Sequence, residues 1–171
     1  FMITYLFSSL GLNDLILNVN SLGCLKCRQP FRAELKSYLG RHFSHLCPDC
    51  QTRMETNPLR VFDCKVETCN QILQDAPSML DFLCNDCANH FDSVRLYLKQ
   101  LGLDFVVNSH LMRGLDYYTR TTFEVQTKEL GAQNAVAGGG RYDNLIKEFG
   151  GQDTPAIGFA IGVERVVELL E

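Results

Sequence analysis

Eight cysteines, all between residues 24 and 87 of the 171-residue chain, constrain the fold more than any other feature. They form three CxxC pairs and one CxxxxC pair, namely Cys24/Cys27, Cys47/Cys50, Cys64/Cys69 and Cys84/Cys87. A CxxC turn presents two thiolates to one metal ion, and Zn²⁺ takes four such soft ligands in a tetrahedron. The spacing favours zinc. The metal would be structural, because four thiolates leave no open position for a substrate.

Two groupings of these pairs are open. Cys47, Cys50, Cys64 and Cys69 have the spacing of a four-cysteine ribbon, which leaves Cys24/Cys27 and Cys84/Cys87 for a second site; the alternative joins Cys47/Cys50 to Cys84/Cys87. Reduced, inert thiols are the competing interpretation. A disulfide framework is disfavoured because nothing indicates secretion, and a redox motif because it uses one CxxC, not four pairs in series. His42 and His45 are the first substitute ligands.

Composition and charge limit the classes of protein. With 46% hydrophobic residues the chain is globular and long enough to bury a core. No apolar run reaches the roughly 18 residues of a membrane span. The apolar start lacks a basic region and is spaced like a helix and a strand, which disfavours a signal peptide. A net charge of −4 argues against strong nonspecific nucleic-acid binding, although residues 24–65 hold eight Lys or Arg against four Asp or Glu.

Hydrophobic periodicity predicts three main helices. They cover residues 1–11, 28–43 and 86–101, with short helices and turns between 46 and 83. The expected apolar positions are Met2, Tyr5, Leu6 and Leu10 in the first helix, Phe31, Leu35, Tyr38 and Leu39 in the second, and Phe91, Val94, Leu96 and Leu98 in the third.

The remaining segments favour strands. Strands are expected at 15–19, 104–107, 121–127, 132–137 and 155–162, the last one buried, with a turn at Gly139 or Gly140, a short helix over 142–149 and a helix from Val163. The predicted fold class is therefore α+β. We expect three parts: residues 1–23 and 103–171 build an antiparallel sheet flanked by helices, and residues 24–102 form an inserted helical domain with the cysteines.

Arginines, tyrosines and glycines crowd the last third of the chain. Arg113 precedes a glycine turn, from which its guanidinium can grip a carboxylate or phosphate bidentately. If this stretch is extended, Tyr117 and Tyr118 point to opposite sides. Three glycines, at 138–140, let the backbone approach a ligand closely. Together with Arg165, they predict a binding cleft on a sheet for a polyphosphate or acyl-phosphate.

Three motifs carry a family resemblance. LMRGLDYYTRTTFEV resembles the first histidine-specific motif of histidyl-tRNA synthetases, AGGGRYDNL the second, and AIGFAIGVERV motif 3 of class II aminoacyl-tRNA synthetases. NPLRVFDCK and DAPSMLDFL resemble the insertion domain of the family and its borders, so the resemblance covers essentially the whole chain. It implies ATP-dependent activation of histidine to histidyl-adenylate and transfer to tRNA(His), in a cytoplasmic homodimer that is not bound to a membrane.

The resemblance also implies residue roles. Arg113 matches the catalytic arginine, which stabilises charge on the α-phosphate of ATP as the histidine carboxylate attacks. The implied histidine site comprises Tyr117, Tyr118, Gly138, Gly139, Gly140 and Tyr142. The implied ATP site comprises Arg113, Gly158, Gly162 and Arg165, with Mg²⁺ accompanying ATP. For Asp116, Arg120 and Glu124 a structural role is at least as well supported.

Two departures from the family pattern qualify this assignment. Motifs 1 and 2 and the anticodon-binding domain are not among these residues, so we expect a fragment that does not activate histidine alone. The cysteines are not part of the defining motifs, so the zinc prediction depends on spacing. Two rivals remain open: a non-ligating paralogue that regulates histidine biosynthesis, and a zinc-stabilised RNA-binding module.

Overall fold

The computed structural model describes residues 1–112, 117–131 and 134–171 and contains a five-stranded sheet ordered β2-β1-β3-β4-β5. The strands are β1 (Ile16–Ser21), β2 (Val106–Val107), β3 (Thr119–Gln126), β4 (Ala135–Arg141) and β5 (Ile157–Ile161). The run from β1 through β3 and β4 to β5 is antiparallel, whereas β2 joins β1 in parallel. The α+β class is confirmed, although the sheet is mixed where antiparallel pairing was expected.

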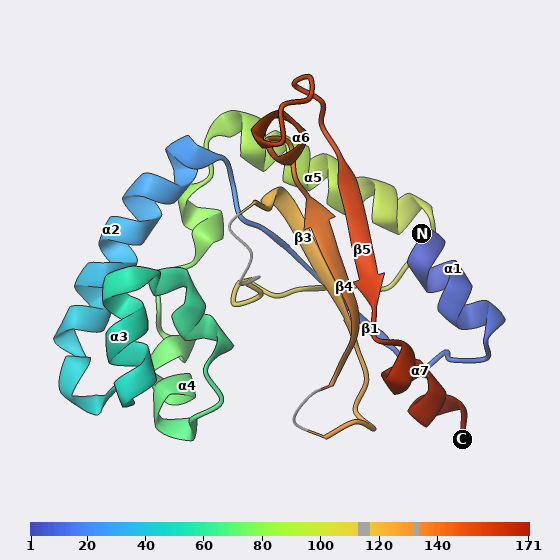
Figure 1. Ribbon diagram of the computed structural model, residues 1–171, viewed down its shortest axis with the longest axis horizontal. Helices are drawn as coiled ribbons and strands as arrows, with labels where there is room; N and C mark the ends of the chain where they lie inside the picture. The colour runs from blue at the N-terminus through green and yellow to red at the C-terminus, as the bar shows by residue number, and fades with distance from the viewer. Residues whose placement is uncertain (113–116, 132–133) are drawn as a thin grey trace.

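Seven α-helices and three short 3₁₀ segments complete the described part of the chain. The helices are α1 (Met2–Ser9), α2 (Leu25–Arg41), α3 (Pro48–Thr56), α4 (Glu67–Gln74), α5 (Asn85–Gln100), α6 (Leu145–Glu148) and α7 (Val163–Leu170); the 3₁₀ segments are Phe43–His45, Pro58–Asp63 and Met79–Phe82. Figure 1 shows α2, α3 and α4 gathered to one side of the sheet, with α1 and α7 at the other side. No helix in the described ranges has the length and apolarity needed to cross a membrane.

The cysteine segment, residues 24–87, has its own core. Phe31, Leu35 and Leu39 of α2 are fully buried against Val61 and Met79 of the 3₁₀ segments. The face predicted for this helix is confirmed. Most other positions of α2 carry charged or polar residues, although Leu25 is an exposed apolar one, so the stripe of Phe31, Leu35 and Leu39 marks the buried side.

A second core lies between the sheet, α1 and α5. Ile3 and Phe7 of α1 and Phe91 of α5 pack on Val19 and Val125 of the strands. The face predicted for the first helix is wrong. Met2, Tyr5, Leu6 and Leu10 are 40–67% exposed. Because five of the eight residues of α1 are apolar or aromatic and lie on several sides of the helix, periodicity could not single out its buried side. Leu96 of α5 is likewise exposed, in the part of the helix that extends past Phe91.

Two predictions about the sheet are also wrong. Gly139 and Gly140 do not form a turn but lie within β4, paired with β3 on one side and β5 on the other. The strand at 155–162 is not buried. β5 has only β4 beside it among the described strands, and the Ile157 side chain is 65% exposed. Glycine weakens a strand but does not end one when neighbouring strands need to approach closely.

Candidate functional site

Alternation along the strands gives the sheet two different faces. Strand register places Leu17, Val19, Phe123, Val125, Gly139 and Phe159 on one side, which we name the apolar face. The other side, the polar face, carries Asn18, Asn20, Thr122, Glu124, Gly138, Gly140 and Gly158. An antiparallel sheet commonly has one polar face, but here Asn18, Asn20 and Thr122 of that face are buried. Burying polar side chains costs free energy unless they find hydrogen-bond partners.

Hydrogen bonds satisfy much of the polar face. Asn18 Nδ2 donates to Gln126 Oε1 at 3.0 Å, and Gln126 Nε2 donates to Glu124 Oε1 at 2.6 Å. The fully buried Asn20 donates to the carbonyl oxygens of Ser109 (3.1 Å) and Leu111 (3.2 Å). The Glu124 carboxylate is thus held in place within a hydrogen-bonded row, which explains how it tolerates a position in the middle of a strand.

Three tyrosines of the predicted histidine site meet at one end of this face. The rings of Tyr117 and Tyr118 lie 4.6 Å apart, and those of Tyr117 and Tyr142 lie 6.0 Å apart, edge to face. Tyr118 is buried, while the other two are half-buried. The expectation that Tyr117 and Tyr118 point to opposite sides is wrong, because both precede β3 and are not part of an extended strand.

Glycines make room for these tyrosines. A Cβ on Gly140 would lie 2.8 Å from Tyr118 Cδ1, and a Cβ on Gly158 would lie 2.7 Å from the Tyr142 hydroxyl. Gly139 has another neighbour. A Cβ there would collide with the backbone of Gly158 and Phe159 in β5. Gly140 and Gly158 therefore admit aromatic rings on the polar face, whereas Gly139 allows two strands to approach.

The predicted nucleotide residues divide between two places. Gly162 and Arg165 line a hollow of about 440 Å³ together with Gly138. Arg165, in the first turn of α7, donates from its guanidinium to the carbonyl oxygen of Ala135. Gly158 is not among the residues lining this hollow and lies beside Tyr142 instead. Arg113 and Asp116 fall outside the described residues.

A strained residue lies next to the tyrosines. Arg120 has φ 53°, a left-handed conformation that non-glycine residues rarely adopt, at a register irregularity between β3 and β4. Its N–H donates to the carbonyl oxygen of Gly23 at 2.9 Å, and its own carbonyl accepts from Leu22 N–H at 2.6 Å. These two bonds tie the start of β3 to the end of β1, beside the first cysteine pair.

The eight cysteines form two groups. The junction cluster contains Cys24, Cys27, Cys84 and Cys87, and the distal cluster contains Cys47, Cys50, Cys64 and Cys69. Within each group the sulfur atoms all lie within 4.8 Å of one another. A tetrahedral zinc site with Zn–S bonds of about 2.3 Å separates its sulfurs by about 3.8 Å. The grouping with ribbon spacing is the one in the structure.

Local structure explains why each CxxC presents two thiols together. The first cysteine of each CxxC caps the N-terminus of a helix, Cys24 for α2, Cys47 for α3 and Cys84 for α5. The second lies in the first turn, so both thiols face the same point. Backbone N–H groups donate to sulfur from Cys84 to Cys27 (3.2 Å) and from Cys47 to Cys69 (3.3 Å). Donors directed at sulfur favour the thiolate that a metal requires.

The thiols of the junction cluster differ in acidity. Burial raises the pKa of Cys24, but hydrogen bonds from the Cys27 and Lys26 backbone outweigh it, and the pKa falls to about 7. Burial raises the pKa of Cys87 well above its ordinary value, and hydrogen bonding to Cys84 and Cys27 raises it further. Four adjacent thiols resist full ionisation without a cation, and a divalent metal removes that resistance.

His90 and Arg28 were missed by the sequence reasoning, and both contact the motif residues. His90 of α5 accepts at Nε2 from the Arg141 guanidinium at 3.2 Å, because arginine can only donate. Arg141 also pairs with Asp143 at 2.6 Å. Burial, followed by the charges of Arg141 and Arg120, lowers the pKa of His90. The signal that could have found His90 is its place in the helical turn after Cys87.

The polar, glycine-lined face and the arginine-bearing helix after β5 define a fold of the class II aminoacyl-tRNA synthetase type. A family model described as histidyl-tRNA synthetase matches residues 53–166. The chain belongs to this family, as the resemblance predicted.

Individual relatives agree with the family. The histidine–tRNA ligase of Desulfosudis oleivorans is 56% identical over 170 residues, which is 99% of this chain and 40% of the relative. The ligase of Syntrophotalea carbinolica is 54% identical over 97% of this chain and 40% of its own length. The chain thus spans about 40% of the length of these curated relatives.

Solved structures share the fold. The crystal structure of apo S. aureus histidyl-tRNA synthetase superposes with a TM-score of 0.73 at 32% identity, over 99% of this chain and 41% of that one. An ATP phosphoribosyltransferase regulatory subunit/histidyl-tRNA synthetase from Bacillus halodurans has a TM-score of 0.53 at 18% identity, over 99% of this chain and 48% of that one. This second likeness shows the fold alone.

Proposed function

We propose that these residues form part of a histidine–tRNA ligase. In the first step the histidine carboxylate attacks the α-phosphate of ATP, giving histidyl-adenylate and pyrophosphate. In the second step a ribose hydroxyl of tRNA(His) takes the histidyl group and AMP leaves. The whole enzyme is longer than this segment, in keeping with the 40% share of its relatives that the chain covers. The segment alone is not expected to activate histidine.

The observation that carries this proposal is the meeting of three tyrosines on a glycine-lined polar face. Tyr117, Tyr118 and Tyr142 offer ring faces and hydroxyl groups to a planar, hydrogen-bonding imidazole. Gly140 and Gly158 keep this end of the face free of side chains that would displace the rings. Gly138 continues the polar face along the same strand, where the substrate backbone can approach the sheet, whereas Gly139 contributes by letting β5 approach β4.

ATP is assigned to the adjoining hollow. Its position next to the tyrosines along β4 suits a nucleotide whose α-phosphate must reach the histidine carboxylate. Arg165 is placed for the outer phosphates, with Gly162 beneath the nucleotide and Mg²⁺ accompanying the phosphates. Gly158 supports the tyrosine side of the site. Arg113 is assigned to the α-phosphate on the resemblance of its motif.

The assignment of partners follows from the same family. We propose tRNA(His) as the nucleic-acid substrate, a homodimer as the assembly and the cytoplasm as the compartment of the full-length protein. We further propose that residues 1–23 and 103–171 belong to the catalytic domain and residues 24–102 to an insertion domain. Basic residues between 24 and 65 could contact the tRNA backbone, and such contacts weaken with salt.

Both cysteine clusters are proposed to bind one structural Zn²⁺ each. All the ligands in each cluster are thiolates, which select zinc over harder cations. Four ligands close the coordination sphere, so the metals have no direct part in the reaction.

A mutation at Arg113 tests the ligase proposal in the full-length protein. Arg113→Ala should lower histidine-dependent ATP–pyrophosphate exchange by a hundredfold or more, since losing one transition-state charge partner costs about 3 kcal/mol. Arg41→Ala, at the exposed end of α2, is the matched control and should retain wild-type exchange.

The same exchange measurement, together with tRNA binding, distinguishes the ligase from the two alternative functions. A non-ligating paralogue has no chemical need for Arg113, Tyr118, Tyr142 and Arg165 together, and wild-type protein would then show no exchange. A zinc-dependent RNA-binding module would bind tRNA until a chelator is added, regardless of the residue at 113. Near-wild-type exchange by Arg113→Ala would refute the role given to that arginine.

Measuring the metal content tests the proposal that each cysteine cluster binds one zinc ion. Elemental analysis of protein purified without added metal should find two zinc ions per chain. Cys50→Ser should remove one of them, since Cys50 belongs to the distal cluster alone. A content near zero in wild-type protein would refute the metal assignment without affecting the ligase proposal.

A further inference from the structure

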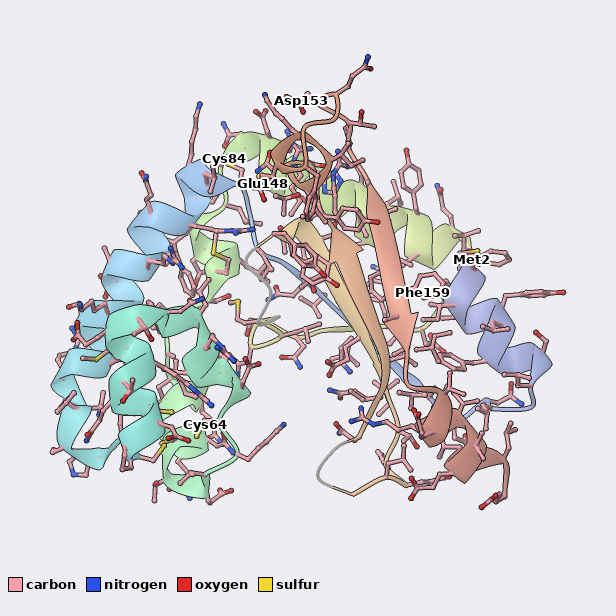
Figure 2. The ribbon with its side chains drawn as sticks, in the orientation of Figure 1. Met2, Cys64, Cys84, Glu148, Asp153 and Phe159 are labelled. Atoms are coloured by element: carbon pink, nitrogen blue, oxygen red, sulfur yellow. The ribbon has the colours of Figure 1, made fainter. Side chains whose placement is uncertain are left out.

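The two cysteine clusters join different parts of the molecule. The distal cluster closes a short stretch, with Cys47 and Cys69 only 22 residues apart. The junction cluster joins residues that are 60 apart in the sequence, such as Cys24 and Cys84, whose sulfurs lie 4.0 Å from each other. Figure 2 shows Cys84 where the cysteine segment meets the sheet and Cys64 at its far end. Only the junction cluster connects two helices that both reach the sheet.

The first of these helices, α2, reaches the tyrosines through Arg28. Arg28 follows Cys27 directly, and its Nε donates to the carbonyl oxygen of Leu22 at 3.1 Å. Its Nη2 donates to the carbonyl oxygen of Tyr118. A shift of the α2 N-terminus would therefore move the backbone that carries Tyr118.

The turn at Gly23 packs closely against the junction cluster. Gly23 has φ +59°, and a Cβ on it would lie 2.6 Å from Cys27 Cβ and 2.8 Å from the end of Met79. The Gly23 carbonyl accepts from Arg120 N–H. The junction cluster is thus packed tightly against the turn to which the start of β3 is hydrogen-bonded.

The second helix, α5, reaches the other histidine motif through His90. This residue lies one turn beyond Cys87 and accepts a hydrogen bond from Arg141. Arg141 is paired with Asp143, whose N–H in turn donates to Thr119 Oγ1 at 3.1 Å. Tyr142 lies between these two charged residues. A displaced α5 would therefore disturb the strand end from which Tyr142 projects.

We propose that metal in the junction cluster positions the histidine pocket, while metal in the distal cluster only stabilises the cysteine segment. The junction ion fixes the N-termini of α2 and α5 to each other, and Arg28 and His90 transmit that placement to Tyr118 and Tyr142. Arg28 and His90 are positioning residues. The ATP hollow is outside this chain of contacts, because its lining in β4 stops at Gly138, before Arg141, and otherwise comes from residues of β5, the start of α7 and Gly162. The inference depends on the proposed zinc binding and histidine activation.

Matched pairs of variants in the full-length protein distinguish the two clusters. Cys84→Ser/Cys87→Ser should remove one zinc and raise KM for histidine by about tenfold or more in pyrophosphate exchange, with KM for ATP changed less than about twofold. Cys47→Ser/Cys50→Ser should remove the other zinc and lower thermal stability, with KM for histidine changed less than about twofold. Equal effects of the two pairs on KM for histidine would overturn the inference.

A second set of variants tests the same route with both metals in place, in case loss of the junction ion prevents folding. Arg28→Gln and His90→Phe should each keep two zincs and raise KM for histidine by severalfold. Arg95→Gln, on the same helix as His90, is the control and should leave KM for histidine at the wild-type value. Wild-type KM in both Arg28→Gln and His90→Phe would refute the route. Absence of zinc in wild-type protein would refute the metal assignment and this inference with it, whereas absence of exchange would refute the ligase proposal.

Discussion

The apolar and polar faces of the sheet are built from the same strands yet have different coverings. Val19 and Val125 on the apolar face are buried beneath α1 and α5. On the polar face, Asn20 and Thr122 are equally buried, but their side chains donate hydrogen bonds to backbone carbonyl oxygens. Adjacent residues of one strand thus meet separate requirements: hydrophobic packing on one side and, in the proposed function, ligand contact on the other.

Removing a large side chain that covers the apolar face should have the greatest effect on stability. Phe7 is 1% exposed and belongs to the core between α1 and the strands. Phe7→Ala should lower the free energy of unfolding by about 3–5 kcal/mol, measured by chemical denaturation. KM for histidine of the remaining folded protein should stay near wild type. Phe7→Leu, which conserves most of the volume, should cost less than about 1.5 kcal/mol. A change of KM in Phe7→Ala would contradict the separation of the faces.

Adjacent glycines offer a sharper test, because they point to opposite faces. Gly139→Ala should cost about 2–3 kcal/mol of stability, since the new methyl group meets the backbone of β5. Gly140→Ala would meet the Tyr118 ring and the Thr121 carbonyl oxygen, and by displacing Tyr118 it should raise KM for histidine, which Gly139→Ala should leave near wild type. Gly40→Ala is the control with open space around it, and should stabilise α2 by up to about 1 kcal/mol. Equal changes in stability and in KM for histidine in the two variants would contradict the assignment of Gly139 and Gly140 to opposite faces.

Near-isosteric exchanges within β3 test the faces one hydroxyl at a time. Val125→Thr would bury a hydroxyl in the apolar core and should cost about 2 kcal/mol. Thr122→Val would remove the hydrogen bond to the Gly139 carbonyl and should cost about 1 kcal/mol. Both values come from denaturation. A larger loss of unfolding free energy in Thr122→Val than in Val125→Thr would contradict the expected difference between the two faces.

The smallest expected effect concerns pH and a polar contact at the end of the apolar face. Burial, with Arg141 and Arg120, lowers the pKa of His90 in the folded state below the ordinary 6.5. The unfolded chain then binds the proton first, so stability is lost as pH falls through about 6.5 toward the folded pKa.

Variants isolate this contribution. Since His90→Gln cannot be protonated, the difference in unfolding midpoint between about pH 7.5 and pH 5.5 should shrink relative to wild type. His45 is exposed, so His45→Gln serves as the control and should show the same difference in unfolding midpoint between the two pH values as wild type. An unchanged pH dependence in His90→Gln would show that its burial has no bearing on acid sensitivity.

The cysteine segment was the more predictable region. Phe31, Leu35 and Leu39 repeat at helical spacing, and one of the two groupings left open by the cysteine spacing is the one that the structure has. The strand through Gly139 and Gly140 could not be predicted in this way. The reason for glycine there is the neighbouring strand β5, which contacts β4 from elsewhere in the sequence.

The contacts that connect the candidate site were also beyond sequence reasoning. The Arg28–Tyr118 hydrogen bond spans 90 residues, and the His90–Arg141 contact spans 51. Neither Arg28 nor His90 lies in a sequence motif that would have identified it. Local pattern thus found the tyrosines themselves, while the side chains that hold them became visible only in three dimensions.

The parallel pairing of β1 with β2 has a consequence for how such a protein can change over time. Two parallel neighbours require a long crossover, and here that connection holds the entire cysteine segment and α5. Lengthening a loop that is already long adds little closure entropy. Residues can therefore be gained or lost inside the crossover without shifting the register of any strand. The part of the crossover around the distal cluster, away from Arg28 and His90, is therefore where the chain can change length with the least effect on the proposed histidine pocket.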